Sequence, residues 1–283
     1  MAASVASVGL KSILVALDLS PRSQLVLDYA ALIARHHCSK IIATHILYYG
    51  SPFPYDEIPP SGFQDVGSAR RSLESMLSSK LPDVEHEVRM SGGDDAPKTL
   101  QAIASEYHVD LIVAGTQGRK GLKKLVAGSV AESLLRRVNC PVMTIGPLVS
   151  GCPATGSLHH ILVATDFSSA CARALSFSCE WSRTYNAGLT ILHVCEESEV
   201  AASKAKLQCC PEAGIEKLVE TGDVAERIAR VAEQKGSGLI TMALHPESPF
   251  LASHLGRTVV HRVITSVHCP VLTFPCTAQS PNR

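Results

Sequence analysis

The sequence contains the same pattern twice, and this repetition constrains the possible fold more than any other feature. Ile13-Leu-Val-Ala-Leu-Asp18 returns as Ile161-Leu-Val-Ala-Thr-Asp166, and Cys140-Pro-Val-Met-Thr returns as Cys269-Pro-Val-Leu-Thr. Each half therefore opens with an apolar run that ends in aspartate and closes with an apolar run after a Cys-Pro pair. Such repetition indicates one structural unit that is built twice.

The length of the chain suits two domains. Its 283 residues give each copy about 140, enough to bury a core of its own. We predict a first domain over 1–147 and a second over 158–283, joined by a linker at 148–157 that is rich in turn-forming residues. The first copy also contains a Pro- and Gly-rich segment at 48–68, predicted to be a long loop, which the second copy shortens.

Short apolar runs alternate with amphipathic stretches along each copy. In the first copy the pattern predicts strands at 13–16, 41–46, 84–90, 111–114 and 142–145, with helices at 22–35, 70–79, 97–107 and 129–138. This alternation is typical of an α/β fold with helices on both faces of the sheet. We predict two tandem, open, mostly parallel five-stranded sheets. Ligands of such sheets bind beyond the carboxyl ends of the strands, where strand order reverses.

The charge balance excludes several classes of partner. The 26 basic and 26 acidic side chains are also evenly divided, 15 against 14 up to residue 150 and 11 against 12 after it. This balance gives no indication of binding to nucleic acid or to a membrane surface. No apolar run is long enough to span a bilayer, and the first ten residues lack the basic and apolar regions of a signal peptide. We expect a cytoplasmic protein.

Ten cysteines are scattered along the chain without a Cys-x-x-Cys pair. We interpret them as buried reduced thiols, because intracellular disulfides are uncommon. The vicinal pair Cys209-Cys210 lies in a polar stretch and leaves two interpretations open, an exposed reactive pair or an ordinary loop. Six others lie within apolar patterns, where a thiol acts as a small hydrophobic group: Cys38, Cys140, Cys171, Cys179, Cys195 and Cys269.

The segment from Gly115 to Val130 has the parts of a phosphate site. It follows a predicted strand and leads into a predicted helix, and it contains Gly118, Gly128 and Ser129. Glycines let backbone approach an anion, and a helix start presents free N–H groups and a favourable dipole. The residues alone leave a second interpretation open, a glycine-rich loop in which Ser129 only caps the helix.

Two residues separate Gly115 from Gly118, and nine separate Gly118 from Gly128-Ser129. This spacing, the aspartate that closes the first strand and the repeat together resemble the universal stress protein family, in its ATP-binding, tandem two-domain form. The resemblance covers nearly the whole chain. It implies a Rossmann-like fold of the adenine nucleotide alpha hydrolase type, ATP (or ADP or AMP) as ligand, and Mg²⁺ bound with the nucleotide.

The resemblance also assigns roles to individual residues. Asp18 would bind near the adenine and ribose, although Asp18 is also a suitable helix cap or turn residue. Further contacts would come from the following positions: Ala16 beside the adenine, Ile46 through its backbone, Ala114 and Gly115 at the ribose and phosphates, and Gly118, Gly128, Ser129 and Val130 at the phosphates. We interpret His45 and His193, at matching strand ends, as structural histidines and not as catalytic ones.

The second copy departs from the pattern at the phosphate segment. Ala243 and Pro246 stand where the first copy has Gly115 and Gly118, and proline removes a donor N–H. The second domain is therefore predicted to be degenerate, with one nucleotide bound per chain. A metal site formed by His245, Glu247 and His254 is an alternative that the spacing alone does not support, and we predict no metal held by the protein itself.

No Walker A motif, nucleophile elbow or paired catalytic carboxylates occur in the sequence, so binding is favoured over catalysis. The leading hypothesis is a nucleotide-responsive stress or signalling module, in which ATP orders the loop at 48–68 and changes contacts with an unidentified protein partner. One alternative is a slow ATPase or self-phosphorylating enzyme that uses Ser129 or Thr116. Another is a structural partner protein with a vestigial site.

The apolar strands that close the two copies, at 141–145 and 270–274, would each leave a sheet edge unpaired. We predict that these two strands pair with one another and form an internal pseudo-dimer. Members of the resembled family associate through their last strands in this manner. A further homodimer of the whole chain is also expected.

Overall fold

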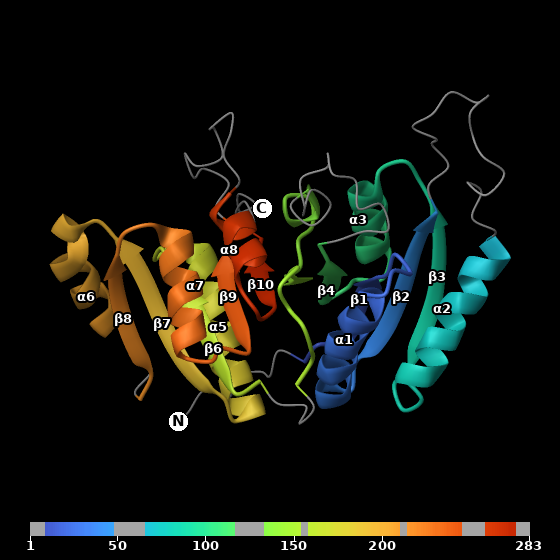
Figure 1. The fold of residues 1–283 in the computed structure, drawn as a ribbon, viewed down its shortest axis with the longest axis horizontal. Helices are drawn as coiled ribbons and strands as arrows, with labels where there is room; N and C mark the ends of the chain where they lie inside the picture. The colour runs from blue at the N-terminus through green and yellow to red at the C-terminus, as the bar shows by residue number, and fades with distance from the viewer. Residues whose placement is uncertain are drawn as a thin grey trace, which may run out of the picture. The chain divides into compact units, whose positions relative to one another are not determined.

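The computed structural model describes residues 9–47, 66–116, 133–153, 158–209, 214–244 and 258–275 (Figure 1). Two compact units divide the chain. The first spans Leu10–Cys140, and the second comprises Pro141 onward together with the extreme N-terminus. None of the helices in the described part of the chain combines the length and apolar character that a bilayer crossing needs.

The first unit is a four-stranded parallel sheet in the order β3-β2-β1-β4. Its central strand β1 is buried on both faces, with Ile13, Leu14 and Val15 fully inaccessible, as a strand covered by helices on both sides requires. The elements follow the chain as β1 (Ser12–Ala16), α1 (Ser23–His37), β2 (Lys40–Leu47), α2 (Val66–Lys80), β3 (His86–Gly92), α3 (Ala96–Glu106) and β4 (Leu111–Gly115).

The second unit repeats this order in β8-β7-β6-β9 and adds two strands, β10 and β5, giving β5-β10-β9-β6-β7-β8. All neighbours are parallel except β5 and β10. Its elements are β5 (Val142–Ile145), β6 (His160–Ala164), α5 (Ser169–Tyr185), β7 (Gly188–Cys195), a 3-10 turn η3 (Glu197–Glu199), α6 (Val200–Gln208), β8 (Glu216–Thr221), α7 (Val224–Gln234), β9 (Leu239–Ala243), α8 (Val259–Ser266) and β10 (Val271–Phe274).

Helices cover both faces of each sheet, because the direction of strand addition reverses once. The chain passes from β1 to β2 to β3 on one side, then crosses back to place β4 on the other side of β1. Parallel crossovers are right-handed, so α1 and α2 lie on one face and α3 lies on the opposite face. The contacts agree, since α1 touches α2 in the first unit and α7 touches α8 in the second. The predicted α/β fold is confirmed.

The strand β5 ends the first copy of the sequence but pairs with the last strand of the second copy. Thr144 lies opposite Val271 and Met143 opposite Leu272 in an antiparallel ladder. The predicted pairing of the two closing strands is confirmed. Because of this pairing the second compact unit begins at Pro141, and the boundaries at 147 and 158 stay predictions about the repeated units.

Within the described residues, the predicted elements of the first copy match the observed ones to within a few positions. The predicted helix at 129–138 lies largely outside the described residues, and so does the predicted loop at 48–68 up to residue 65. Helix starts are fixed by side-chain caps that could be anticipated from composition. Asp95 accepts a hydrogen bond from Lys98 N at the start of α3, and Asp223 accepts one from Glu226 N at the start of α7.

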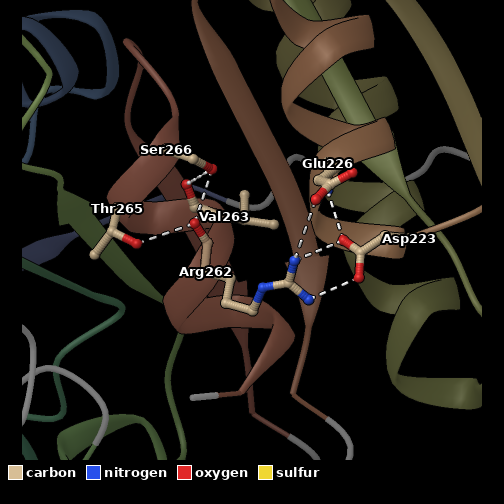
Figure 2. Close-up of polar contacts among 6 residues, drawn as sticks. All are labelled: Asp223, Glu226, Arg262, Val263, Thr265 and Ser266. Atoms are coloured by element: carbon tan, nitrogen blue, oxygen red, sulfur yellow. Dashed lines mark hydrogen bonds and ion pairs between the residues drawn. The ribbon is translucent and has the colours of Figure 1, made fainter. Parts of the chain in front are cut away.

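Asp223 also joins two helices of the second unit. Both of its carboxylate oxygens accept hydrogen bonds of 2.8 Å from the Arg262 guanidinium on α8, and Glu226 lies 4.0 Å from the same group (Figure 2). The Arg262 guanidinium keeps the pKa of Asp223 below its ordinary value. The cap of α7 thus also ties α7 to α8.

The eight described cysteines are free thiols. Cys171, Cys179 and Cys269 are buried as predicted, and burial raises the pKa of Cys269 to about 12. The prediction was wrong for Cys38, which is exposed because it caps α1 in a left-handed conformation with φ of 55°. Cys209 is exposed too, whereas Cys210 lies outside the described residues.

Candidate functional site

Asp18 lies in a tight turn just beyond the carboxyl end of β1. Its Oδ1 accepts hydrogen bonds from Ser20 N at 3.0 Å and from Ser23 Oγ at 2.6 Å. Leu19, between them, has a positive φ of 60°. The helix itself begins later, with Arg22 at the N-cap position, so Asp18 is a turn residue and not the cap of α1.

The other carboxylate oxygen of Asp18 has a different environment. Oδ2 is buried and has no hydrogen-bond partner among the described residues, and the same holds for Ser20 Oγ in the same turn. Leaving a buried carboxylate oxygen without a donor costs free energy that a ligand donor can recover. One oxygen therefore fixes the turn, and the other remains available for a ligand.

The backbone at the end of β2 lies at the same carboxyl-terminal edge of the sheet, where the strands end, as Asp18. Thr44 O accepts from Leu17 N, and Leu47 O accepts from Gly93 N on the opposite side. Successive residues of a strand direct their N–H and C=O groups to alternate sides, so Ile46 faces the β1 side, beyond the last paired residue of β1. The backbone of Ile46 thus offers one donor and one acceptor near Asp18.

His45 holds this edge in place. Its Nδ1 lies 2.7 Å from Leu17 O, and because a carbonyl can only accept, Nδ1 carries the proton and donates. His193 Nδ1 makes the same bond to Thr165 O at 2.7 Å in the second copy. Both histidines therefore tie the end of one strand to its neighbour, as a structural role requires.

The carboxyl end of β4 completes the described part of the site. Ala16 pairs directly with Ala114 across the β1-β4 boundary, which is the point where strand order reverses. A Cβ on Gly115 would come within 3.2 Å of Val26 Cγ2 on α1. Close packing against α1 is therefore one physical reason for glycine at this position. The sequence suggests a second reason, the close approach of a ligand to the backbone.

The remaining predicted contacts, Gly118, Gly128, Ser129 and Val130, lie outside the described residues. So do His245, Glu247 and His254 of the alternative metal site. Across the described ranges, no group of three or more His, Cys, Asp and Glu side chains is placed to hold a metal ion. The structure thus brings together Ala16, Asp18, Ile46, Ala114 and Gly115 at one edge.

In the equivalent turn of the second copy a thiol replaces a hydroxyl. Asp166 Oδ1 accepts from Ser168 N at 2.8 Å, which reproduces the turn around Asp18. The position equivalent to Ser23 is Cys171, whose thiol lies 3.8 Å from Ala164 O and also interacts with the Asp166 carboxylate. Asp166 is exposed, in contrast to the half-buried Asp18. The turn is thus retained, while the carboxylate has a different environment.

An aromatic stack occupies the same end of β6. The ring of Phe167 lies 4.3 Å from that of His193, and Lys206 Nζ lies 5.4 Å from the Phe167 ring. Phe167 has a positive φ of 64° and stands where the first copy has Leu19. A large side chain and a cation at this turn give the second copy a different surface from the first.

Sequence reasoning missed two residues that shape the first site, Ser23 and Val26. Ser23 holds the Asp18 carboxylate, and Val26 packs against Gly115. The repeat contains a signal, because the second copy changes both positions, to Cys171 and Ala174.

The sequence model of the universal stress protein family matches residues 9–146 and again 157–208, which is more than half of the chain. The chain belongs to the universal stress protein family. The second match ends before β8, so it leaves out the part of the second copy where the predicted phosphate segment is altered. Universal stress protein A homolog 1 of Coxiella burnetii is 32% identical over 146 residues, which cover 48% of this chain and 95% of that protein.

Solved universal stress proteins share the fold of the whole chain. One from Archaeoglobus fulgidus aligns with 93% of this chain and 98% of its own, with 20% identity and a TM-score of 0.65. A putative universal stress protein from Pseudomonas aeruginosa aligns with 94% of this chain and 93% of its own, with 18% identity and a TM-score of 0.66. The tandem α/β architecture is therefore shared across distant members of the family.

Proposed function

We propose that this universal stress protein binds one adenine nucleotide, ATP, at the carboxyl ends of β1 and β4, and acts as a nucleotide-responsive stress or signalling module. The observation that carries the proposal is Asp18 Oδ2, a buried carboxylate oxygen with no partner among the described residues. It lies where strand order reverses, which is the usual ligand position in open α/β sheets.

The chemistry of this edge suits a nucleoside. A carboxylate is acceptor-only, so Asp18 Oδ2 would accept a hydrogen bond from a ribose hydroxyl. The N–H and C=O of Ile46 would match the acceptor and donor groups on the edge of an adenine ring. Ala16 and Ala114 are small, which leaves room for a ring and a sugar above the strand ends.

The phosphates would extend toward Gly118, Gly128, Ser129 and Val130, as the sequence pattern suggests. Mg²⁺ bound with the phosphates would be held mainly by the nucleotide, because Asp18 is the one carboxylate that we place at this edge. The chain would then supply backbone donors and the Ser129 hydroxyl, and the ion would supply compensation of phosphate charge.

We propose binding and not efficient turnover. His45 ties two strand ends through Nδ1 and is 4% exposed, so its ring is shielded from water. Neither the sequence pattern nor the described residues place a base or an arginine at the terminal phosphate, and hydrolysis should be well below about 1 s⁻¹, the lower end of ordinary turnover. Single-turnover assays with Mg²⁺ test this, with Ser129→Ala as the control for a hydroxyl role.

Calorimetric titration of ATP into Asp18→Asn tests the site. Asparagine keeps the Oδ1 acceptor for Ser20 N but removes the charge, and hydrogen bonds to charged groups are worth about 1.5–3 kcal/mol. We expect binding about tenfold to a hundredfold weaker, with a stoichiometry of one per wild-type chain. The matched control is Asp166→Asn in the second copy, which should leave the affinity unchanged.

Equal loss in both variants would place the nucleotide elsewhere or in both copies. The complete absence of ATP binding by the wild-type chain, with no thermal shift on adding nucleotide, would instead favour the structural partner protein with a vestigial site. Gly118→Pro gives the corresponding test of the phosphate segment, and wild-type affinity in that variant would contradict the assignment of Gly118.

A further inference from the structure

A polar chain connects five residues of the second unit at the opposite end of the strands from the proposed nucleotide edge. His160, at the start of β6, lies with Nδ1 2.9 Å from Ser237 Oγ and with Nε2 3.0 Å from Thr190 Oγ1. Thr190 Oγ1 donates to Glu216 Oε2 at 2.8 Å, and Lys235 Nζ donates to Glu216 Oε1 at 2.6 Å. Serine, histidine and carboxylate are thus joined through a threonine.

The direction of each hydrogen bond follows from the carboxylate. The Lys235 ammonium lowers the pKa of Glu216, so Glu216 is ionised and can only accept. Thr190 has one hydroxyl proton and gives it to Glu216, so it must accept from His160 Nε2–H. Burial lowers the pKa of His160, an effect that Lys235 reinforces and Glu216 opposes, and the neutral ring then has its lone pair on Nδ1. Ser237 Oγ–H donates to that lone pair.

The first copy lacks this arrangement at equivalent positions. Ser12 pairs with Lys40 in the first copy, where His160 pairs with Gly188 in the second. A Cβ on Gly188 would come within 3.0 Å of His160 Cδ2, so the absence of a side chain there makes room for the imidazole. The neighbouring buried position has also changed, from Ile42 to Thr190, whose hydroxyl is needed only for this chain of bonds.

We propose that Ser237 is a nucleophile activated by His160, and that it is a site of covalent modification by electrophiles that carry a good leaving group, such as activated acyl or phosphonyl compounds. An activated serine needs a base within hydrogen-bond reach and a third group that orients the base, and here His160 is the base and Thr190, held by Glu216, orients it. Thr190 and Glu216 are positioning residues that fix the tautomer of His160. Ser237 is half-buried, between Gly236 and Gly238.

The reaction with a fluorophosphonate illustrates the step. Ser237 Oγ forms a bond to phosphorus, the P–F bond breaks, fluoride leaves with its electron pair, and the hydroxyl proton passes to His160 Nδ1. The product is a phosphonyl ester of Ser237 and an imidazolium that returns its proton to water. No oxidant or reductant takes part.

The hydrogen bonds of the backbone around Ser237 favour a single modification of Ser237 over catalytic turnover. The N–H groups of Gly236, Ser237 and Gly238 all donate to carbonyls, of Glu233, Ala232 and His160. These three groups are therefore not free to stabilise an oxyanion, which is a large contribution to acyl-transfer catalysis. We expect the adduct to form once per chain and to persist.

The experiment uses the full-length wild-type chain and a fluorophosphonate probe, with intact-mass measurement and peptide mapping. We expect one phosphonyl group per chain, on the peptide that contains Ser237, and none in Ser237→Ala. In His160→Gln the rate should fall by about 100-fold, the lower end of a general-base contribution. In the wild-type chain the rate should rise with pH as His160 loses its proton.

Ser266 provides a matched control, because it is an exposed serine whose hydroxyl donates to Arg262 O (Figure 2). Among the described residues it has no hydrogen bond to an imidazole. It should remain unlabelled. Absence of label on Ser237 in the wild-type chain would overturn the proposal without any variant. Equal rates in the wild-type chain and a folded His160→Gln would overturn it too, as would labelling of Ser266 at the same rate.

Discussion

Asp18 and Asp166 occupy the same turn in the two copies, yet the side chains around the two carboxylates differ. Ser23 holds the first carboxylate, whereas Cys171 stands at the equivalent position of the second. The strand ends and the histidine bonds at His45 and His193 are the same in both. The comparison shows that the side chains at the carboxyl ends of the strands can change while the sheet that supports them does not.

The interiors of the copies differ by coupled changes. The first copy packs Val26 against Gly115, whereas the second has Ala174 and Ala243 at those positions. The second copy therefore has a larger residue on the strand and a smaller one on the helix. The second copy also has an aromatic group on α5, where the first copy has Tyr29, Ile33 and His37. Close packing requires such compensation, because a core tolerates little change of volume.

The largest expected effect concerns that aromatic group. Trp181 is 1% exposed, and its ring lies 4.6 Å from Phe177 and 5.4 Å from Tyr185. Trp181→Ala should lower the free energy of unfolding by about 3–5 kcal/mol, because it leaves a large cavity. Urea unfolding measures this loss.

The matched variant in the first copy is Ile33→Ala, which removes a smaller buried side chain and should cost about 2–5 kcal/mol. If the units unfold separately, each variant should move a different transition. A loss below 1 kcal/mol for Trp181→Ala would show that the aromatic group does not support the second core.

A smaller effect tests the coupled change at β4. Gly115→Ala should destabilise the chain by about 1–3 kcal/mol, because its Cβ would press on Val26 Cγ2. In a double-mutant cycle with Val26→Ala, which imitates the second copy, the two losses should be less than additive by about 1 kcal/mol. Strict additivity would mean that the two positions changed independently.

The pH dependence of stability should involve one histidine in each copy. Burial lowers the pKa of His160 and of His37 below the ordinary value. The unfolded chain therefore binds protons first as the pH falls below about 6.5, so these groups cost stability below that pH and none above it. Each group contributes a slope of at most about 1.4 kcal/mol per pH unit.

Urea unfolding at pH 7.5 and pH 5.5 checks this, since His160→Gln and His37→Gln should each reduce the loss between the two conditions. Because the two histidines lie in different copies, the two variants report on the pH dependence of each copy separately. An unchanged pH dependence in His160→Gln would show that its imidazole is as easily protonated in the folded chain as in the unfolded one.

The smallest effect compares two ion pairs. Arg262 makes two hydrogen bonds to Asp223, whereas Arg137 lies 3.7 Å from Asp95 in the first copy. Both pairs are partly exposed, so Arg262→Met should cost only about 0.5–1 kcal/mol and Arg137→Met less than about 0.5 kcal/mol. Thermal unfolding measures both, and a larger loss for Arg137→Met would reverse the expected order.

The strand and helix pattern was predictable because burial of a parallel sheet imposes apolar runs that the sequence shows directly. The repeat then predicted the pairing of β5 with β10, since an edge strand needs a partner. The places of Asp18 and Gly115 at strand ends could be predicted from the apolar runs, whereas Ala16 and Ile46 were named from the family resemblance. The direction of the Ile46 backbone follows only once the strand register is known.

The side chains around the site were harder to predict. Ser23 and Val26 act through contacts across a turn and across a helix, and no local pattern marks them. The group formed by His160, Thr190 and Ser237 joins segments far apart in the sequence, so only the sheet register brings it together. Cys38 was misassigned because its apolar neighbours belong to a helix that ends there.

The antiparallel pair of β5 and β10 has a consequence for how such a chain can change over time. Two strands on one chain meet at an effective concentration of about millimolar, whereas strands on separate chains depend on expression level. The pairing of β5 with β10 does not depend on the residues at the carboxyl ends of the other strands. A chain of this kind can therefore carry Ala243 where the first copy has Gly115, and a polar group at the start of β6, without losing the antiparallel pair.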